Sequence, residues 1–221
     1  PNNYYKFSNW SDSNQTASRS YSPTGDVTLV AYFTRSHWVV TVANGDNGVA
    51  YAGGTGTYKS MAVAVGSNVI IRAIPNTNFK LASWAITAGS GPTPPATATV
   101  TYTPTADVTL RATFTRDKWL AQALVNDAAG GSAVITTNGA TSGYFQNGAS
   151  VAFKATPKAG YYFSVWSRWV RGTGSISDVG TATFTQTMPS AEFAARAWFY
   201  LDRYQITVSV TGSTFGDANA E

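Results

Sequence analysis

The chain has 221 residues, of which 43% are apolar and 14% aromatic, and this composition predicts packed hydrophobic cores rather than disorder. It contains no cysteine, which excludes disulfides, thiol nucleophiles and cysteine-ligated metals. The net charge of +4 comes from 15 Lys and Arg that are scattered singly, so no basic stripe predicts nucleic-acid binding, and no apolar stretch of about 18 residues predicts insertion into a membrane.

The first element in chain order is an aromatic phrase that occurs three times. The opening residues PNNYYKFSNW return as PNTNFKLASW at 75–84 and as PKAGYYFSVW at 157–166. Each phrase is followed by a run in which apolar residues alternate strictly, at 27–35, 108–116 and 193–201. Period-two alternation predicts a β-strand with one face on a core, so the chain is a tandem repeat of strand-rich units.

Further strands are predicted before and after this framework. New strands are predicted to begin at Trp38, Trp119 and Tyr204, with the sequences WVVTV, WLAQA and YQITV. Two of the aromatic phrases are preceded by a further predicted strand, NVIIRAIP and SVAFKATP. Asn-Gly pairs between strands supply the left-handed backbone of tight hairpins. Each unit is therefore predicted to be an all-β, antiparallel domain of about 80 residues with almost no helix.

The repeat boundaries predict four segments. Residues 1–36 are the C-terminal half of a repeat, 37–117 and 118–202 are complete repeats, and 203–221 are the N-terminal hairpin of another. The connections TRSH, TRDK and YLDR are four residues long, and such a segment spans only about 13 Å, so a stiff, rod-like array is expected. We expect the pattern to continue on both sides, with completion of the half-repeat by a second copy of the chain as the alternative.

These residues resemble the divergent internalin-type (InlB-like) B-repeat domains of bacterial surface proteins. The resemblance lies in the opening aromatic strand, the Gly-rich hairpin, the G-x-x-V strand, the aromatic-x-x-x-x-W phrase and the closing D-V-T-L-x-A-x-F strand. It covers essentially the whole chain. It implies an exported repeat that acts as a spacer, stalk or adhesive module.

Residues that recur in every unit are expected to serve the fold. A large aromatic residue closing each small core is the simplest interpretation of the repeated tryptophans, with sugar stacking as the alternative. The inward positions of the closing strands belong to the same cores. The predicted core residues are Trp10, Trp84, Trp166, Phe33, Phe114 and Phe199.

Residues that occur in one unit only are free to serve a partner. The third repeat adds a tryptophan within WSRWVRG and another within RAWF, on the strand face opposite Phe199. Extra aromatic and arginine side chains on a solvent-facing surface predict an interface or sugar contact, and burial under a local loop is the alternative. The candidate contact residues are Trp169, Arg168, Arg171, Trp198, Arg196 and Tyr200.

No constellation of residues predicts catalysis, a metal site or a cofactor. The single histidine, His37, lies in a connection without a triad pattern, and the eleven acidic residues show no paired spacing. The chain is therefore expected to be a non-enzymatic, extracellular part of a bacterial surface stalk, adhesin or fibre. Its expected partners are neighbouring repeats, with further copies of the chain or a surface polysaccharide as candidates. The alternative is a carbohydrate-binding array of a secreted polysaccharide-active protein.

Overall fold

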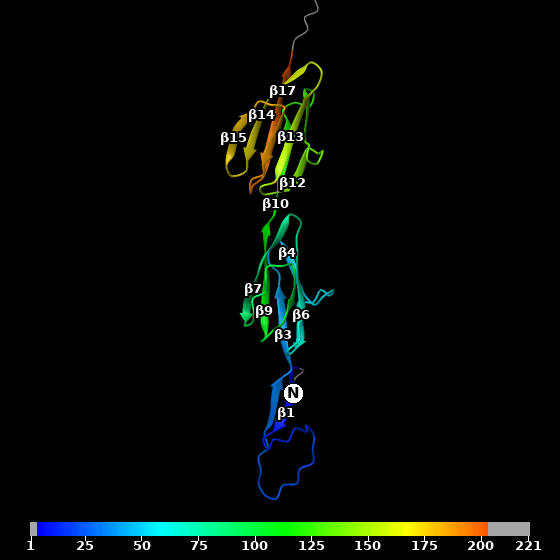
Figure 1. Cartoon of the computed structure of the whole chain (residues 1–221), viewed down its shortest axis with the longest axis vertical. Helices are drawn as coiled ribbons and strands as arrows, with labels where there is room; N and C mark the ends of the chain where they lie inside the picture. Colours follow the sequence, from blue (N-terminus) through cyan, green and yellow to red (C-terminus); the bar gives the residue numbers. More distant parts are fainter. Residues whose placement is uncertain (1–3, 203–221) are drawn as a thin grey trace, which may run out of the picture. The chain divides into compact units, whose positions relative to one another are not determined.

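A computed structural model describes residues 4–202, and every regular element in this part of the chain is a β-strand (Figure 1). The described residues contain no helix with the length and apolarity needed to span a membrane. The chain divides into two compact units, residues 1–118 and 119–221. The fourth segment expected from the sequence, 203–221, lies outside the described residues.

The first unit begins with a two-stranded sheet and continues with a complete repeat. The sheet pairs β1 (Tyr5–Trp10) with β2 (Ala31–Arg35). The repeat has two sheets, with strand orders β5-β3-β9-β7 and β4-β6-β8. Its strands are β3 (His37–Ala43), β4 (Gly48–Ala52), β5 (Ser60–Ala64), β6 (Val69–Pro75), β7 (Phe79–Gly89), β8 (Thr99–Tyr102) and β9 (Val108–Arg116).

The second unit repeats this topology and adds one strand. Its sheets have the orders β12-β10-β17-β14-β15 and β11-β13-β16. The added strand is β15, which follows the lengthened loop after Val170. The strands are β10 (Lys118–Val125), β11 (Gly131–Ile135), β12 (Ser142–Gln146), β13 (Ser150–Pro157), β14 (Tyr161–Val170), β15 (Gly174–Val179), β16 (Thr183–Thr187) and β17 (Phe193–Leu201).

One pairing in each repeat is parallel, although most of the ladders are antiparallel as the sequence predicts. Strand β3 pairs with β9 in register Val40 to Val108, and β10 pairs with β17 in register Ala121 to Phe193. The closing strand of each repeat thus lies between the opening strand and the aromatic strand β7 or β14. A parallel pair needs a long crossover, and the three-stranded sheet of each repeat supplies it.

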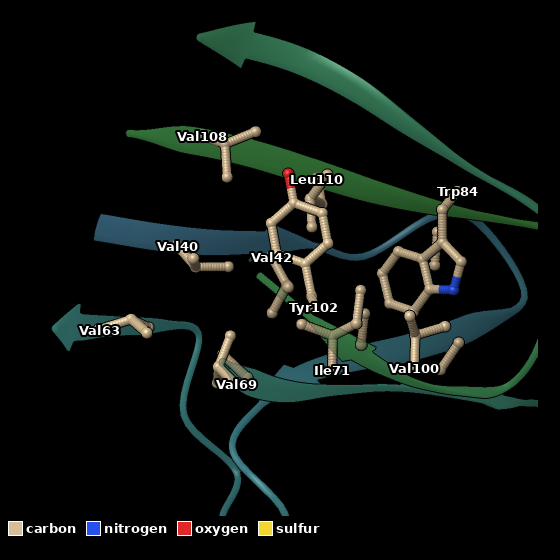
Figure 2. Close-up of a cluster of buried hydrophobic side chains, with 14 residues drawn as sticks. Val40, Val42, Val63, Val69, Ile71, Trp84, Val100, Tyr102, Val108 and Leu110 are labelled. Carbon is tan, nitrogen blue, oxygen red and sulfur yellow. The ribbon is translucent and has the colours of Figure 1, made fainter. Parts of the chain in front are cut away.

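The complete repeat of the first unit, residues 37–117, is called the second repeat, and that of the second unit, residues 118–202, the third. The core of the second repeat fills the space between its two sheets (Figure 2). Val40 and Leu110 come from one sheet and Ile71 from the other, and all three are fully buried. Trp84 is only 3% exposed, and its indole Nε1 donates a hydrogen bond to the carbonyl of Thr97 at 3.1 Å. This bond satisfies the one polar atom of the side chain that plugs the core.

The core of the third repeat, residues 118–202, contains a cluster of packed aromatic side chains. Trp166 is fully buried, and its Nε1 donates to the carbonyl of Ala182 at 3.3 Å. Its ring lies edge-on to that of Phe184 at 5.3 Å, and Phe184 stacks on Phe153 with ring centroids 4.9 Å apart. Such aromatic pairs stabilise a core beyond the area that they bury.

The first segment departs from the prediction made for it. Phe33 was predicted to be a core residue, but it is 45% exposed, and Trp10 is only partly buried. The closing strand, predicted over 27–35, begins only at Ala31. The physical reason is the missing second layer: β1 and β2 form a sheet of two strands, and in residues 4–36 no third strand covers their apolar face.

An ion pair joins this first segment to the second repeat within the same unit. The guanidinium of Arg35 pairs with the carboxylate of Asp107, and it donates to the hydroxyl of Tyr5 at 2.9 Å and to the carbonyl of His37 at 2.8 Å. Asp107 also accepts a hydrogen bond from the backbone N–H of Val39 at 2.7 Å. Asp107 therefore holds two segments of the chain together.

The first prediction concerns the recurring tryptophans that fill the repeat cores. Trp84→Ala should lower the free energy of unfolding of the first unit by about 3–5 kcal/mol, because it leaves a cavity between the two sheets. Guanidinium denaturation of the full chain measures this. Trp10→Ala is the matched control at the corresponding position, and it should cost clearly less because Trp10 is partly exposed. Equal costs at the two positions would contradict the assignment of the cores.

The second prediction concerns the pH dependence of stability. The hydrogen bond from Val39 and the ion pair with Arg35 hold the pKa of Asp107 below its ordinary value. This group therefore stabilises the first unit above the unfolded carboxyl pKa of about 3.9, and the contribution is lost as the pH falls through the lower folded pKa.

Denaturation of Asp107→Asn between pH 6 and about pH 2 should show a weaker fall in stability than the wild type over that acid range. Asp26→Asn, at the corresponding exposed position of the first segment, is the control and should behave like the wild type. An unchanged acid response in Asp107→Asn would show that the carboxylate does not stabilise the fold.

Candidate functional site

The outward face of the five-stranded sheet in the third repeat carries most of the residues that occur in one repeat only. Alternation along β17 buries Phe193, Ala195, Ala197 and Phe199 in the core, and it directs the residues between them to the other face. Those outward residues are Ala194, Arg196, Trp198 and Tyr200. Four of the six candidate contact residues are found on this face once Trp169 of β14 is included.

Trp169 reaches the outward face because it lies three residues after the buried Trp166. Successive strand residues point to opposite faces, so an odd separation places the two tryptophans on opposite sides of the sheet. Trp169 pairs with Ala194 of β17 on one side and with Ser175 of β15 on the other, and both neighbours are small. The indole is 43% exposed as a result.

A hollow of about 300 Å³ lies beside Trp169. Four neighbouring strands contribute to it, namely β10, β17, β14 and β15. Tryptophan and arginine side chains stand around short side chains that leave space between them. The lining residues are Leu124, Ser167, Arg168, Trp169, Ser175, Ala194 and Arg196.

Trp198 lies next to this hollow and is held against the sheet. Its indole Nε1 donates a hydrogen bond to the Ser167 hydroxyl oxygen at 2.9 Å, and the side chain is partly buried. The bond crosses from β17 to β14. Trp198 therefore positions Ser167 at the edge of the hollow and does not itself line it.

The arginines of the candidate set have different environments. Arg168 lies over the ring of Phe184 at 5.6 Å, and its guanidinium donates to the carbonyl of Ser177 and to the side chain of Gln186. Arg171 pairs with Glu192 at 3.2 Å in the turn that follows β14. Arg196 is exposed and forms no ion pair within the described residues. It is the arginine whose guanidinium remains available to a ligand in the hollow.

Tyr200 belongs to a separate aromatic pair. It is 47% exposed, and its ring centroid lies 6.1 Å from that of Tyr162, its cross-strand neighbour. The six residues therefore do not form a single cluster. Trp169, Arg168 and Arg196 line one hollow, Trp198 flanks it, and Tyr200 and Arg171 lie outside its lining.

The second repeat has a hollow on the corresponding face, and the comparison identifies what the third repeat adds. That hollow measures about 230 Å³ and is lined by Ala88 and Asp107, among others. Ala88 pairs with Thr109 as Trp169 pairs with Ala194, so the alanine occupies the place of the tryptophan. The hollow belongs to the repeat framework, whereas the aromatic wall is specific to the third copy.

The remaining chemistry of the described residues is sparse. Within residues 4–202, no three His, Asp or Glu side chains gather closely enough to hold a metal ion. His37 contacts the hydroxyl of the adjacent Ser36 through Nδ1 at 3.0 Å. The arrangement on the outward face is suited to binding, since it combines an exposed indole, a guanidinium and two hydroxyls.

Comparison with known proteins identifies the family. The model of the divergent InlB B-repeat domain matches residues 1–37, 38–118 and 123–202, so the chain belongs to this repeat family of bacterial surface proteins. A search of curated proteins gave no significant match.

Two solved structures resemble the chain weakly. A mutant of the major pilin from Streptococcus pyogenes is 8% identical, with a TM-score of 0.26, over 74% of this chain and 98% of the pilin. The Bacillus anthracis TIE protein is 6% identical, with a TM-score of 0.23, over 80% of this chain and 52% of that protein.

The third prediction separates the two tryptophans of the outward face. Trp198→Phe should lower the free energy of unfolding of the second unit by about 0.5–1.5 kcal/mol, because it removes the hydrogen bond to Ser167. Trp169→Phe should change it by no more than about 0.5 kcal/mol, since the indole is exposed and small neighbours surround it. Denaturant unfolding of both variants provides the measurement. A larger cost for Trp169→Phe would mean that this side chain serves the fold.

Proposed function

We propose that this chain is a non-enzymatic, load-bearing repeat region of an extracellular bacterial stalk, adhesin or fibre. Membership of a repeat family of bacterial surface proteins supports the location. The recurring residues of the repeats are used in packing and backbone hydrogen bonding, which supports a structural role. The observation that carries the proposal is the parallel pairing of the first and last strands of each repeat.

This pairing determines how a repeat responds to tension along the chain. In the second repeat the chain enters at the start of β3 and leaves at the end of β9. Because the two strands are parallel neighbours, their entry and exit points lie at opposite ends of the pair. A force along the chain therefore loads the hydrogen bonds of the pair together, in shear, and does not open them one at a time.

The third repeat has the same arrangement, with a longer run of paired residues. Residues 121–125 of β10 pair with 193–197 of β17, whereas residues 40–43 of β3 pair with 108–111 of β9. In both repeats the closing strand is also held on its other side by the long aromatic strand β7 or β14. A strand held on two sides must lose both ladders before the repeat can extend.

Single-molecule force spectroscopy tests the load-bearing role, and the chain suits it because it has no cysteine of its own. Pulling from the two ends should give one high-force rupture for each complete repeat. A repeat of about 80 residues should release roughly 280 Å of chain at about 3.5 Å per residue. Forced unfolding follows the unfolding rate, so the rupture force reports directly on the barrier of the shear geometry.

A second pulling geometry provides the control. Lys80 and Thr115 are cross-strand partners near one end of the antiparallel pair β7 and β9, and both are exposed. Handles attached at Lys80→Cys and Thr115→Cys should unzip this pair at clearly lower force than the end-to-end pull. Equal forces in the two geometries would contradict a mechanical role for the parallel pair. Antibody binding to intact cells of the source bacterium tests the extracellular location.

Carbohydrate binding is the second candidate function, and one observation favours it. The third repeat alone adds an exposed tryptophan to a hollow that the framework already contains. A surface polysaccharide is the partner expected for this candidate, whereas copies of the chain are partners expected in a fibre.

A further inference from the structure

We infer that the outward face of the third repeat binds an acidic polysaccharide, with Trp169 stacking on a sugar ring and Arg196 pairing with its carboxylate. This site uses side chains on the solvent face of the sheet, including Arg196 of the load-bearing strand pair, and it involves none of the backbone hydrogen bonds of that pair. It does not depend on that function.

The first step of the argument is the aromatic platform. Trp169 is exposed in a hollow whose neighbouring side chains are short, and it packs against no other aromatic ring in the described residues. Trp169 adds little to the core, and Ala88 occupies the matching position of the second repeat. The fold therefore does not require a tryptophan at this position. An open indole face is a surface on which the apolar side of a sugar ring can lie, because the indole is itself amphipathic.

The second step is charge. Arg196 supplies the available positive charge of the hollow, and no acidic residue lines it. The guanidinium of Arg168 is engaged over Phe184 and with Ser177 and Gln186. The nearest acid in the turn, Glu192, forms an ion pair with Arg171. The hollow is therefore electropositive, and a planar guanidinium favours a carboxylate because two N–H groups can bind its two oxygens. A neutral sugar would leave this charge without a partner.

The third step is hydrogen bonding. The hydroxyl oxygen of Ser167 accepts the hydrogen bond from Trp198, which leaves its own hydrogen free to donate. Ser175, which pairs with Trp169 across β15 and β14, adds a second hydroxyl. Hydroxyls beside an aromatic platform match the hydroxyls around a sugar ring.

The fourth step is size. A second hollow, of about 450 Å³, shares Leu124 and Arg196 with the first and continues past the end of β10 to β11 of the other sheet. The two together leave room for more than one sugar ring, with Arg196 between them. The arrangement therefore fits a short stretch of a polysaccharide that carries carboxylates.

Isothermal titration calorimetry of the full chain tests this inference. The probe is a hyaluronan tetrasaccharide, which alternates glucuronate with N-acetylglucosamine, and the neutral comparison is a tetrasaccharide of N-acetylglucosamine. We expect the acidic probe to bind at least tenfold more tightly than the neutral one, and its binding to weaken at high salt.

Three variants assign the binding to the hollow. Trp169→Ala and Arg196→Ala should each weaken binding of the acidic probe at least tenfold, and Arg196→Lys should recover part of the loss because it keeps the charge. Tyr144→Ala removes an exposed aromatic side chain of the same sheet outside the hollow, and it should have no effect. Circular dichroism establishes that each variant is folded.

Several outcomes would overturn the inference: no binding of the acidic probe at millimolar concentration, binding that survives Trp169→Ala, or equal binding of the neutral probe with no loss in Arg196→Ala. The pulling experiment distinguishes failure here from failure of the load-bearing role, because Trp169→Ala leaves the backbone ladder of β10 and β17 intact and should not change the rupture force.

Discussion

The parallel pairing of the opening and closing strands is the constraint on which each repeat depends. It places β9 or β17 in the middle of its sheet, so that the inward residues of this strand reach the core from a central position. It requires the chain between the two strands to cross the core, and the strands β4, β6 and β8, or β11, β13 and β16, form the second layer. The same pairing separates the points of entry and exit, which is the geometry a chain under tension needs.

The recurring tryptophan connects this framework to the loops. In all three segments the indole donates to a loop carbonyl, at Thr16, Thr97 and Ala182. The bond is present even for Trp10, which is partly exposed because only two strands form its sheet. The tryptophan therefore acts both by filling the core and by fixing the long connection toward the closing strand.

The sequence predicted the parts of the fold that depend on local pattern. Alternation along 108–116 and 193–201 correctly separates buried from outward residues, because a strand has a period of two. The same pattern at 27–35 misplaced Phe33, since burial also requires a second layer that local pattern cannot reveal. The hollow was only partly predictable. Trp169 and Arg196 stood out, but Leu124 and Ser175 join them through strand register, which depends on the whole fold.

The repeats also show why the outward face is where a new function can arise. Core positions are constrained by close packing, and even a small change in volume affects stability there. The outward position of Ala88 in the second repeat meets no such constraint, so the third repeat can carry Trp169 in its place. Thr113 and Trp198 occupy another such pair of outward positions, paired with Ser83 and Val165 respectively. A framework that already contains a hollow thus needs only one or two substitutions on its solvent face to become a binding surface.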